Sequence, residues 1–330
     1  MKISIAMATY NGEKYLQEQL DSFVSQTRQP DELVVTDDCS TDATPELLEA
    51  FAQTAPFDVI VQRNERNYGY CGNFNQALVR ASGDLVFLSD QDDVWFPEKI
   101  ERMARAAQDH PEDLVLMNDA ALTHGDLSET GLTKLGQINS AGFSEDSFVM
   151  GCCAAVRRDL LEVCLPIPEE FPAHDGWVVG IADGMRRKRV IPEVLQHYRR
   201  HGQNESQWIV NRTTRVSRWN VKVLKWKGRL KRWFKPKPDD IQTRGGAPSS
   251  QALLQDWVES AVNGAPPPYE ADLRHYLDRM EARARAIERR DKIRRAPFPK
   301  RLREVIKANG DDTYAAFSGW KSAMRDLVGR

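Results

Sequence analysis

The sequence is poor in cysteine, and its five cysteines are placed where disulfide pairing is unfavourable. Their number is odd, no Cys-x-x-Cys pair occurs, and the adjacent Cys152 and Cys153 have poor geometry for a bridge. A long hydrophobic run is also lacking, at the N-terminus and further along, so neither a secretory leader nor a membrane span is predicted. We therefore expect a cytoplasmic protein with reduced thiols.

Neither sign of charge dominates the 330-residue chain, whose formal net charge is −2. The molecule as a whole is not a polycation of the kind that binds nucleic acid, and no nucleic-acid partner is expected. Hydrophobic residues make up 41% of the chain, which permits a sizeable core beside a polar portion. The length allows one large domain, or one domain with an appendage.

Short apolar runs alternate with helical patterns through the first part of the chain. The runs at 3–8, 32–36, 57–61 and 85–88 have the pattern of buried strands, and helical spacing appears between them, as at 15–25. This alternation favours an α/β fold with a mostly parallel sheet flanked by helices. Ligands of such sheets bind outside the carboxyl ends of the strands.

The second half of this region is less regular. A strand is predicted at 114–117 and a small-residue strand at 148–156, and the polar segment 119–147 between them is expected to be a mobile loop. A helix is predicted from residue 173 to 184, and strand-like pieces at 189–198 close the domain.

Polar side chains follow three of the predicted strands. The most acidic group, Asp90-Gln91-Asp92-Asp93, comes directly after the apolar run 85–88, and the others are Thr9-Tyr10-Asn11 and Asp37-Asp38. Carboxylates at the end of a buried strand need a cation or hydrogen-bond donors, and Mg²⁺ and Mn²⁺ prefer oxygen ligands. The acidic group therefore indicates a metal site, with the alternative that it is a polar loop capping the next helix.

The character of the chain changes near residue 206. Basic residues continue from Arg212 to Lys235 without an intervening acid, and apolar residues spaced three and four apart predict a helix over 206–235. A cationic face opposite a tryptophan-rich stripe is typical of a helix in a membrane interface. Packing of this helix on the rest of the protein, and nucleic-acid binding, are the alternatives. The stripe consists of Trp219, Val223, Trp226, Leu230 and Trp233.

The remainder of the chain predicts helices. Pro, Gly and Ser at 236–250 indicate a linker, and an amphipathic helix at 251–262 is followed by a long charged helix at 269–295. We therefore expect a C-terminal α-helical extension over 251–330, in which no motif indicates chemistry.

Six short motifs occur in the order and spacing of one family. Together they resemble a family 2 glycosyltransferase of the GT-A fold, the inverting kind that uses nucleotide-sugar donors, over residues 1–205. The acidic motif with its Trp95, and the ending at 198–204, look most like bacterial rhamnosyltransferases of cell-surface polysaccharide synthesis. The motifs are Ala8–Gly12, Asp37–Asp42, Asn67–Gly69, Asn73–Asn75, Asp90–Asp93 and His174–Trp177.

The resemblance implies roles for individual residues. Asp175 is the expected general base, which removes the proton of the acceptor hydroxyl, and a divalent metal, Mn²⁺ or Mg²⁺, would assist departure of the diphosphate. Local alternatives remain, because Asp37-Asp38 fits a turn initiator and Asp175 fits a helix N-cap. The implied nucleotide-binding residues are Thr9, Tyr10, Asn11, Asp38, Asn73 and Asp90; the metal ligands are Asp90, Asp92, Asp93 and His201; the acceptor or phosphate side is Gly151, His174, Trp177 and Arg199.

The expected architecture is a GT-A domain over 1–205, a basic helix over 206–235, a linker over 236–250 and a helical extension. The resemblance implies transfer of a sugar, rhamnose from dTDP-rhamnose or another sugar from a UDP-sugar, to a glycan or lipid-linked glycan. Such an enzyme would be cytoplasmic, with the basic helix on an anionic membrane at the inner face of the plasma membrane. The alternatives are a nucleotidyltransferase and a non-catalytic binding module of the same fold.

Overall fold

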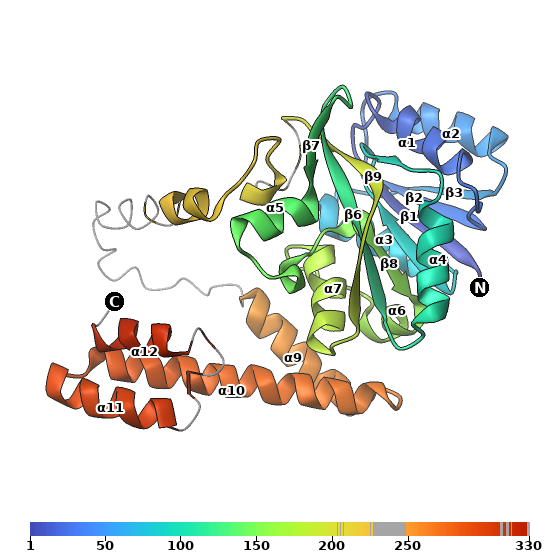
Figure 1. Ribbon diagram of the computed structural model, residues 1–330. Coiled ribbons are helices and arrows are strands. Elements are labelled where there is room, and N and C mark those ends of the chain that lie inside the picture. Colours follow the sequence, from blue (N-terminus) through green and yellow to red (C-terminus); the bar gives the residue numbers. More distant parts are fainter. Residues whose placement is uncertain are drawn as a thin grey trace. The chain divides into compact units, whose positions relative to one another are not determined.

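The computed structural model describes residues 1–202, 204, 206, 208–224, 226, 249–310, 313, 314, 317 and 319–328. The chain divides into two compact units, Met1–Ser250 and Gln251–Arg330. The first is an α/β unit, and the second consists of helices (Figure 1). Most of the predicted linker, together with Leu230 and Trp233 of the predicted stripe, lies outside the described residues.

A nine-stranded sheet organises the first unit, in the order β3-β2-β1-β4-β8-β6-β9-β5 with β7 paired to β6. Strands β3, β2, β1 and β4 run parallel, whereas β8 is antiparallel to both of its neighbours and β9 is parallel to β6. The predicted α/β class is thus confirmed, with a mixed half that the strand–helix alternation did not predict. The strands are β1 (Ile3–Thr9), β2 (Glu32–Asp37), β3 (Asp58–Arg63), β4 (Leu85–Ser89), β5 (Val94–Trp95), β6 (Val115–His124), β7 (Glu129–Thr133), β8 (Ala154–Arg157) and β9 (Lys188–Arg200).

Helices lie on both faces of this sheet. Alternate residues of β1, namely Ile3, Ile5 and Met7, join one core cluster with apolar residues of α1, α2 and α4. The opposite face carries α3, where the Thr36 hydroxyl of β2 donates to the Asn73 carbonyl. The helices of this unit are α1 (Leu16–Val24), α2 (Thr44–Thr54), α3 (Gly69–Arg80), α4 (Lys99–Asp109), α5 (Lys134–Ala141), α6 (Arg158–Cys164) and α7 (His174–Gly184), with 3₁₀ turns at Glu145–Ser147, Gly151–Cys153 and Ile209–Asn211.

Two predictions of secondary structure are wrong. The expected loop 119–147 contains the end of β6, all of β7 and the helix α5, because Leu135 and Ile138 anchor one short apolar face that a search for longer patterns passes over. The strand predicted over 148–156 begins only at Ala154, after a 3₁₀ turn at Gly151–Cys153.

The basic segment begins as irregular chain and not as a helix. Residues 208–217 run along α5, where the Gln137 side chain and the Ser140 hydroxyl bond to the chain near Val216, and helical structure starts only at residue 218. Trp219 is 71% exposed and Trp226 is 61% exposed, so these two tryptophans are not core residues. The start of the segment therefore packs along α5, while Trp219 and Trp226 face solvent.

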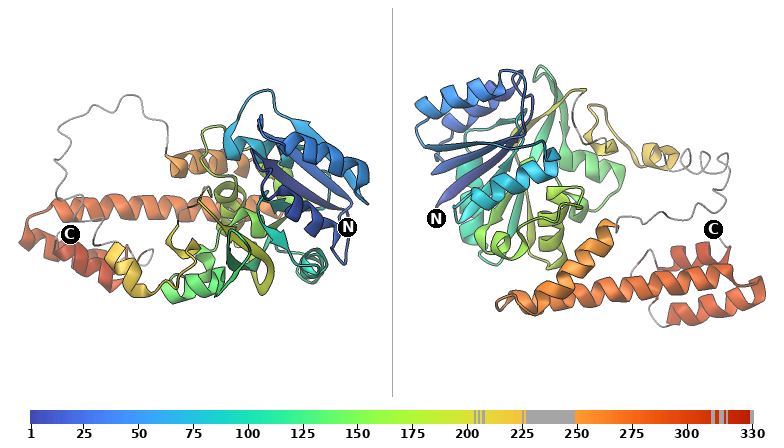
Figure 2. Two further views of the ribbon diagram at one scale, coloured as in Figure 1. Left: turned by 90° about the horizontal axis from the view of Figure 1, so that it is seen from above. Right: turned by 180° about the vertical axis from the view of Figure 1, so that it is seen from behind.

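The second unit confirms the predicted helices, which are α9 (Ser250–Val262), α10 (Tyr269–Arg295), α11 (Phe298–Gly310) and α12 (Trp320–Leu327). Figure 2 shows α11 and α12, in red, alongside α10, and a small apolar cluster that includes Ile293 and Val305 joins the three helices. The buried Asp326 carboxylate accepts hydrogen bonds from Arg290 and Arg294. Among the described helices, none combines the length and apolarity that crossing a bilayer requires.

Candidate active site

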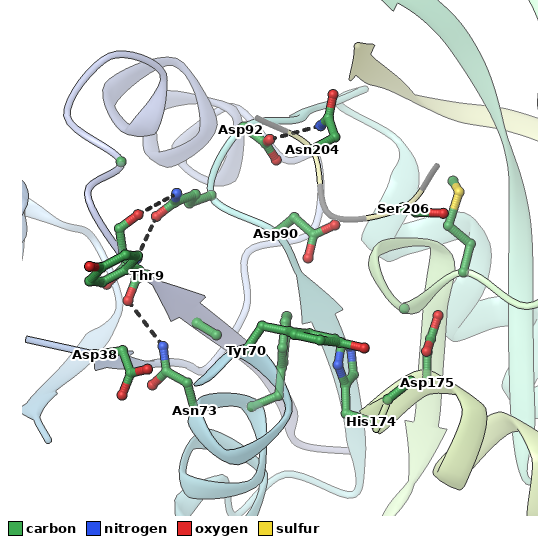
Figure 3. Close-up of a pocket in the computed structure, with 18 of the residues that line it drawn as sticks. Thr9, Asp38, Tyr70, Asn73, Asp90, Asp92, His174, Asp175, Asn204 and Ser206 are labelled. Atoms are coloured by element: carbon green, nitrogen blue, oxygen red, sulfur yellow. Dashed lines mark hydrogen bonds between the residues drawn. The ribbon is translucent and has the colours of Figure 1, made fainter. Parts of the chain in front are cut away.

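A pocket of about 760 Å³ opens at the carboxyl ends of β1, β2 and β4. Figure 3 shows Thr9, Asp38 and Asn73 on one side of it, Asp90 in the middle, and Asp175 and Ser206 on the other side. Of the predicted site residues, all but Asp93, Trp177 and Arg199 line this pocket. Those that line it are Thr9, Tyr10, Asn11, Asp38, Asn73, Asp90, Asp92, Gly151, His174, Asp175 and His201.

Hydrogen bonds between strand ends shape the first side. The Asn73 amide donates to the Thr9 carbonyl over 3.0 Å, and the Thr9 hydroxyl donates to Asp37 over 3.1 Å. Asn11 has φ +46° and is held there by bonds to the loop after β2, since its backbone N–H donates to the Ser40 hydroxyl over 2.8 Å. The loops after β1 and β2 therefore form one rigid wall.

Asp37 and Asp38 have different positions. The Asp37 carboxylate accepts from the backbone N–H of Ser40 over 2.9 Å, as expected of a turn initiator. Asp38 is buried but lines the pocket, and it accepts from the Asn64 amide and the backbone N–H groups of Tyr68 and Gly69 over 2.8–2.9 Å. A carboxylate has about four acceptor positions, so Asp38 can hold this loop and accept one further bond.

The middle of the pocket is acidic. Burial, followed by the charges of Asp92, Asp93 and Asp175, raises the pKa of Asp90 well above its usual range. Asp92 Oδ2 lies 2.7 Å from His201 Nε2 and accepts from the Asn204 amide over 3.2 Å. The capping alternative fails, because β5 separates these acids from α4, which begins at Lys99.

This donor set fits a divalent cation. Asp90 and Asp92 supply carboxylate oxygens and His201 an imidazole nitrogen, which are ligand types that Mn²⁺ accepts, and Mg²⁺ binds through the carboxylates. Burial first, and then repulsion among carboxylates, raise the pKa of Asp90, and a cation bound there would offset the repulsion.

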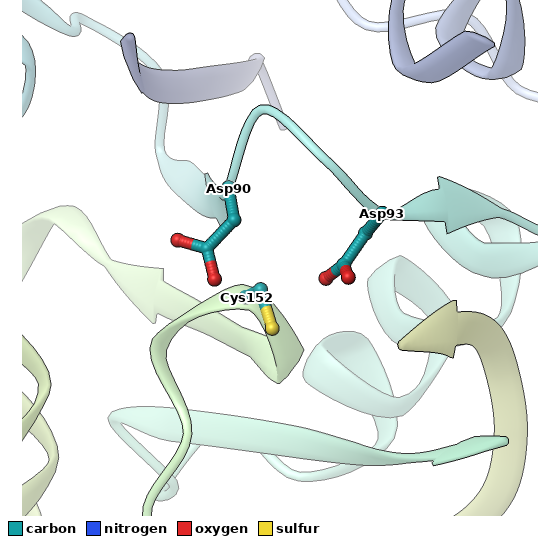
Figure 4. A group of neighbouring side chains, drawn as sticks. All are labelled: Asp90, Asp93 and Cys152. Atoms are coloured by element: carbon teal, nitrogen blue, oxygen red, sulfur yellow. The ribbon is translucent and has the colours of Figure 1, made fainter. Parts of the chain in front are cut away.

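Asp93 does not line the pocket, and its predicted role as a metal ligand stays a prediction, since it forms with Asp90 and Cys152 a group that could hold a metal ion. In Figure 4, Asp90 and Asp93 stand at the two ends of one loop with Cys152 below, and ligand atoms of the three lie within 4.8 Å of one another. The Asp93 side chain is fully buried and accepts from the Gln196 amide over 2.9 Å and from the backbone N–H of Arg199 over 3.1 Å. It therefore joins the acidic loop to β9, and burial raises its pKa to about 7.

Asp175 and His174 begin α7. The N-cap of this helix is Ala173, so the interpretation of Asp175 as an N-cap is wrong; its carboxylate lies in the first helical turn and lines the pocket. The ring of His174 is 4% exposed and stacks on Phe74 with centroids 3.8 Å apart, and both of its nitrogens lack a hydrogen-bond partner. Burial lowers the pKa of His174 to about 4, which leaves the ring neutral at physiological pH.

Gly151 is required by this arrangement. A Cβ atom at position 151 would lie 2.5 Å from His174 Nε2, which is closer than real Cβ contacts come. The small residue lets the pocket wall approach the histidine ring directly.

Two residues predicted for the acceptor or phosphate side lie elsewhere. Trp177 is fully buried and donates from its indole N–H to the Cys164 carbonyl over 2.8 Å. Arg199 is 2% exposed, and its guanidinium donates to the carbonyls of Asp92 and Gly125 and to Glu18. Both predictions fail for the same reason. Each side chain points into the protein and makes its hydrogen bonds there.

The far side of the pocket is built by residues that the sequence analysis did not single out. They come from α5, the end of β9 and the chain that follows it, and the signal for α5 was only Thr133 before a short apolar spacing. These residues are Lys134, Tyr198, Ser206, Trp208 and Asn211.

Comparisons with known proteins agree with this geometry. Residues 4–165 match the model of glycosyl transferase family 2. An uncharacterised glycosyltransferase of Nostoc sp. (strain PCC 7120) is 31% identical over 218 residues, 62% of this chain and 66% of that protein. An uncharacterised protein of Mycobacterium tuberculosis is 28% identical over 211 residues, 60% of this chain and 59% of that protein. The chain thus spans just under two thirds of the length of these relatives.

A third relative is also known in three dimensions. The poly(ribitol-phosphate) β-N-acetylglucosaminyltransferase TarS of Staphylococcus aureus is 36% identical over 120 residues, 36% of this chain and 21% of TarS. The crystal structure of its residues 1–349 in complex with UDP covers all of this chain and 89% of that one, with a TM-score of 0.54 and 20% identity. At this identity the likeness shows the fold, which is GT-A.

Proposed function

The chain belongs to glycosyltransferase family 2 and has the GT-A fold, and on that premise we propose that it is an inverting glycosyltransferase. It moves a sugar from a nucleotide-sugar donor to a hydroxyl of a glycan acceptor. One observation carries the proposal: Asp90, Asp92 and Asp175 come from two distant segments and meet in the pocket that Thr9 and Asp38 also line.

Asp175 acts as the general base. Inversion needs one carboxylate that accepts the acceptor proton while the hydroxyl attacks from the side opposite the leaving group. Asp175 lies in the first turn of α7 and lines the pocket, where its carboxylate can meet the acceptor hydroxyl. The neutral His174 beside it is stacked on Phe74 and forms the wall behind the base.

Asp90, Asp92 and His201 would hold the divalent cation, Mn²⁺ or Mg²⁺. When bound, the ion acts as a Lewis acid that stabilises charge on the departing diphosphate. Asn204 donates to Asp92 and thereby orients this carboxylate, and the Arg199 guanidinium fixes the Asp92 carbonyl from behind.

The donor carries a pyrimidine nucleotide. The free acceptor capacity of Asp38 suits the N–H of a pyrimidine base, and the carbonyl and hydroxyl groups around Thr9 and Asn73 suit the nucleoside. dTDP-rhamnose is the first donor to test, from the resemblance to rhamnosyltransferases. UDP-N-acetylglucosamine is the second, because TarS has been crystallised with it.

A donor panel tests the proposal. The protein with Mn²⁺ is incubated with dTDP-rhamnose, UDP-N-acetylglucosamine and other nucleotide sugars, and separately with dTTP or UTP and a sugar 1-phosphate, and free nucleoside diphosphate and pyrophosphate are quantified. We expect nucleoside diphosphate from one donor, at a rate that an acceptor glycan increases. Pyrophosphate would instead identify a nucleotidyltransferase, and binding without either product would identify a non-catalytic module.

The exposed tryptophans support peripheral binding to the inner face of the plasma membrane, where a lipid-linked acceptor would be found. Trp219 and Trp226 face solvent in a segment rich in Lys and Arg, a combination that partitions into anionic lipid surfaces. Changing Trp219 and Trp226 to Glu together should abolish co-sedimentation with phosphatidylglycerol vesicles. Trp320→Glu, an equally exposed tryptophan in the second unit, is the control. Equal sedimentation of parent and double variant would remove this part of the proposal.

A further inference from the structure

Lys134 places a buried ammonium group at the far side of the pocket. It is the first residue of α5 and is 1% exposed, yet it lines the pocket. Its Nζ donates to the Asn211 side-chain carbonyl, and the Asn211 amide donates to the Ser206 hydroxyl over 2.7 Å. Ser206 lies beyond Asp90 and near Asp175 in Figure 3, on the side away from Thr9 and Asp38.

The ammonium has few partners inside the protein. Besides Asn211, it lies over the Trp208 ring at 4.7 Å from the centroid, and no carboxylate of the described residues pairs with it within 4.0 Å. Asp119 of β6 accepts hydrogen bonds at its carboxylate from the backbone N–H groups of Leu135 and Ala120. A buried cation with one neutral acceptor is costly, because an ammonium has three N–H donors and loses its hydration.

The charges around Lys134 act on its pKa in both directions. Burial is the main cause that lowers its pKa to about 8, and the nearby Arg200 acts in the same direction. The Asp175 carboxylate acts in the opposite direction, so Lys134 lies within electrostatic reach of the proposed base. A negative group bound beside Lys134 would therefore be close to the hydroxyl that Asp175 deprotonates.

The backbone at the start of α5 cannot bind such a group instead. The N–H of Leu135 donates to Asp119 over 2.9 Å, and the N–H of Gly136 donates to the Thr133 hydroxyl over 3.1 Å. These helix donors are already used, which leaves the Lys134 ammonium as the group that faces the pocket.

We propose that Lys134 binds an anionic group of the acceptor, a carboxylate or a phosphate ester, and that Asn211 and Trp208 position its ammonium. This inference rests on the proposed function, which gives the side near Asp38 and Asp90 to the donor and leaves the side near Lys134 to the acceptor. The acceptor is thus an acidic glycan or a phosphorylated one, and the acidic middle of the pocket keeps its anionic group at the Lys134 end.

Calorimetric titration with matched sugars tests this inference. The protein is first loaded with Mn²⁺ and the nucleoside diphosphate that it binds, and is then titrated with glucuronic acid against glucose, and with N-acetylglucosamine 1-phosphate against N-acetylglucosamine. We expect at least one anionic sugar to bind about tenfold more tightly than its neutral partner, as a charge-assisted hydrogen bond allows. The first pair reports a carboxylate acceptor and the second a phosphate acceptor.

Lys134→Met should remove this preference while the affinity for the nucleoside diphosphate stays unchanged. Asn211→Asp is a second variant, which neutralises the ammonium with an adjacent carboxylate of the same size and should also remove the preference. Lys300→Met, an exposed lysine in the second unit, changes the net charge equally and should leave the preference intact.

Three results would overturn the inference. The parent protein could bind neither anionic sugar, or could bind each no better than its neutral partner. The preference could persist in a folded Lys134→Met or Asn211→Asp protein. Finally, Lys134→Met could lower the affinity for the nucleoside diphosphate as much as the affinity for the anionic sugar. That result would place the lysine in the donor-binding site. None of these results depends on turnover. A failure of this inference can therefore be distinguished from a failure of the proposed sugar transfer, which the donor panel measures.

Discussion

The two ends of the pocket contain ionisable groups of opposite sign. At one end Asp90 and Asp92 line the pocket, and burial followed by the charges of Asp92, Asp93 and Asp175 raises the pKa of Asp90. At the other end Lys134 is buried over Trp208 without an acidic partner among the described residues. In the second unit, the buried Asp326 is paired with two arginines. The contrast indicates that the pocket's charges are completed by ligands, a cation at one end and an anion at the other.

The largest effect is expected from substitution of Asp175, the proposed base between the two ends of the pocket. Asp175→Asn keeps the shape of the side chain but cannot accept the acceptor proton, and we expect the transfer rate to fall by about 10³-fold. Affinity for the nucleoside diphosphate, measured by calorimetry, should stay near that of the parent. Asp183→Asn on the same helix, outside the pocket, serves as the control. Unchanged turnover in Asp175→Asn would disprove the mechanism.

The acidic end is tested through the metal. Asp92→Asn removes the carboxylate that His201 and Asn204 orient, and we expect metal-dependent affinity for the nucleoside diphosphate to fall about 10- to 100-fold. Chelation of the parent with EDTA should produce a loss of the same size, and added Mn²⁺ should restore the parent alone. Asp126→Asn, on the exposed turn between β6 and β7, should behave as the parent. Metal-independent binding in the parent would contradict the metal site.

The wall behind the base gives a smaller effect. Gly151→Ala places a methyl group 2.5 Å from His174 Nε2, so the ring and the start of α7 must shift. We expect transfer to fall about tenfold through misplacement of Asp175, with the donor KM little changed. Gly180→Ala on the same helix has open space at its Cβ and is the matched control. Equal rates for the two variants would show that this contact does not position the base.

Glu32, a buried carboxylate with hydrogen-bond donors inside the protein, serves as the reference for the ionisable groups of the pocket. Its substitution should not change the rate of sugar transfer. Glu32 is buried, and although burial opposes it, hydrogen bonds from Ser4, Ser82 and Lys2 hold its pKa at about 2. Because this pKa lies below the unfolded value of about 4.3, the stabilisation is present above about pH 4.3 and is lost as the pH falls toward 2. Glu32→Gln should lose about 1 kcal/mol in urea unfolding at pH 7. A parent–variant difference that does not narrow below pH 4 would contradict the pairing.

Local patterns predicted much of the fold and of the site. The acids after β4 and the polar residues after β1 and β2 were predicted to share a site, because carboxyl ends of parallel strands meet at one edge of a sheet. The helix that begins at His174 was also placed correctly from its sequence. These features depend on residues near one another in the chain.

The errors concern direction and distance. Trp177 and Arg199 stand beside pocket residues in the sequence, but their side chains turn into the protein. Asp93 is also buried and does not line the pocket, while its role as a metal ligand stays a prediction. Alternation along a strand or helix sends neighbours to opposite sides, so adjacency to a motif does not place a side chain in a site. The pattern also could not show that Asp38 already holds a loop, since its partner Asn64 belongs to another segment.

The sequence by itself determined the family, the strand–helix order and the acidic end of the pocket, because each depends on residues that are close together in the chain. Only the tertiary structure decided the opposite end, where Lys134 meets Trp208 and Asn211 from more than seventy residues further along the chain. A lone lysine in a polar segment is indistinguishable in sequence from a solvated one. Its burial, its contact with the neutral Asn211 acceptor and its place in the lining of the same pocket as the proposed base exist only once β6, α5 and the chain after β9 are packed together.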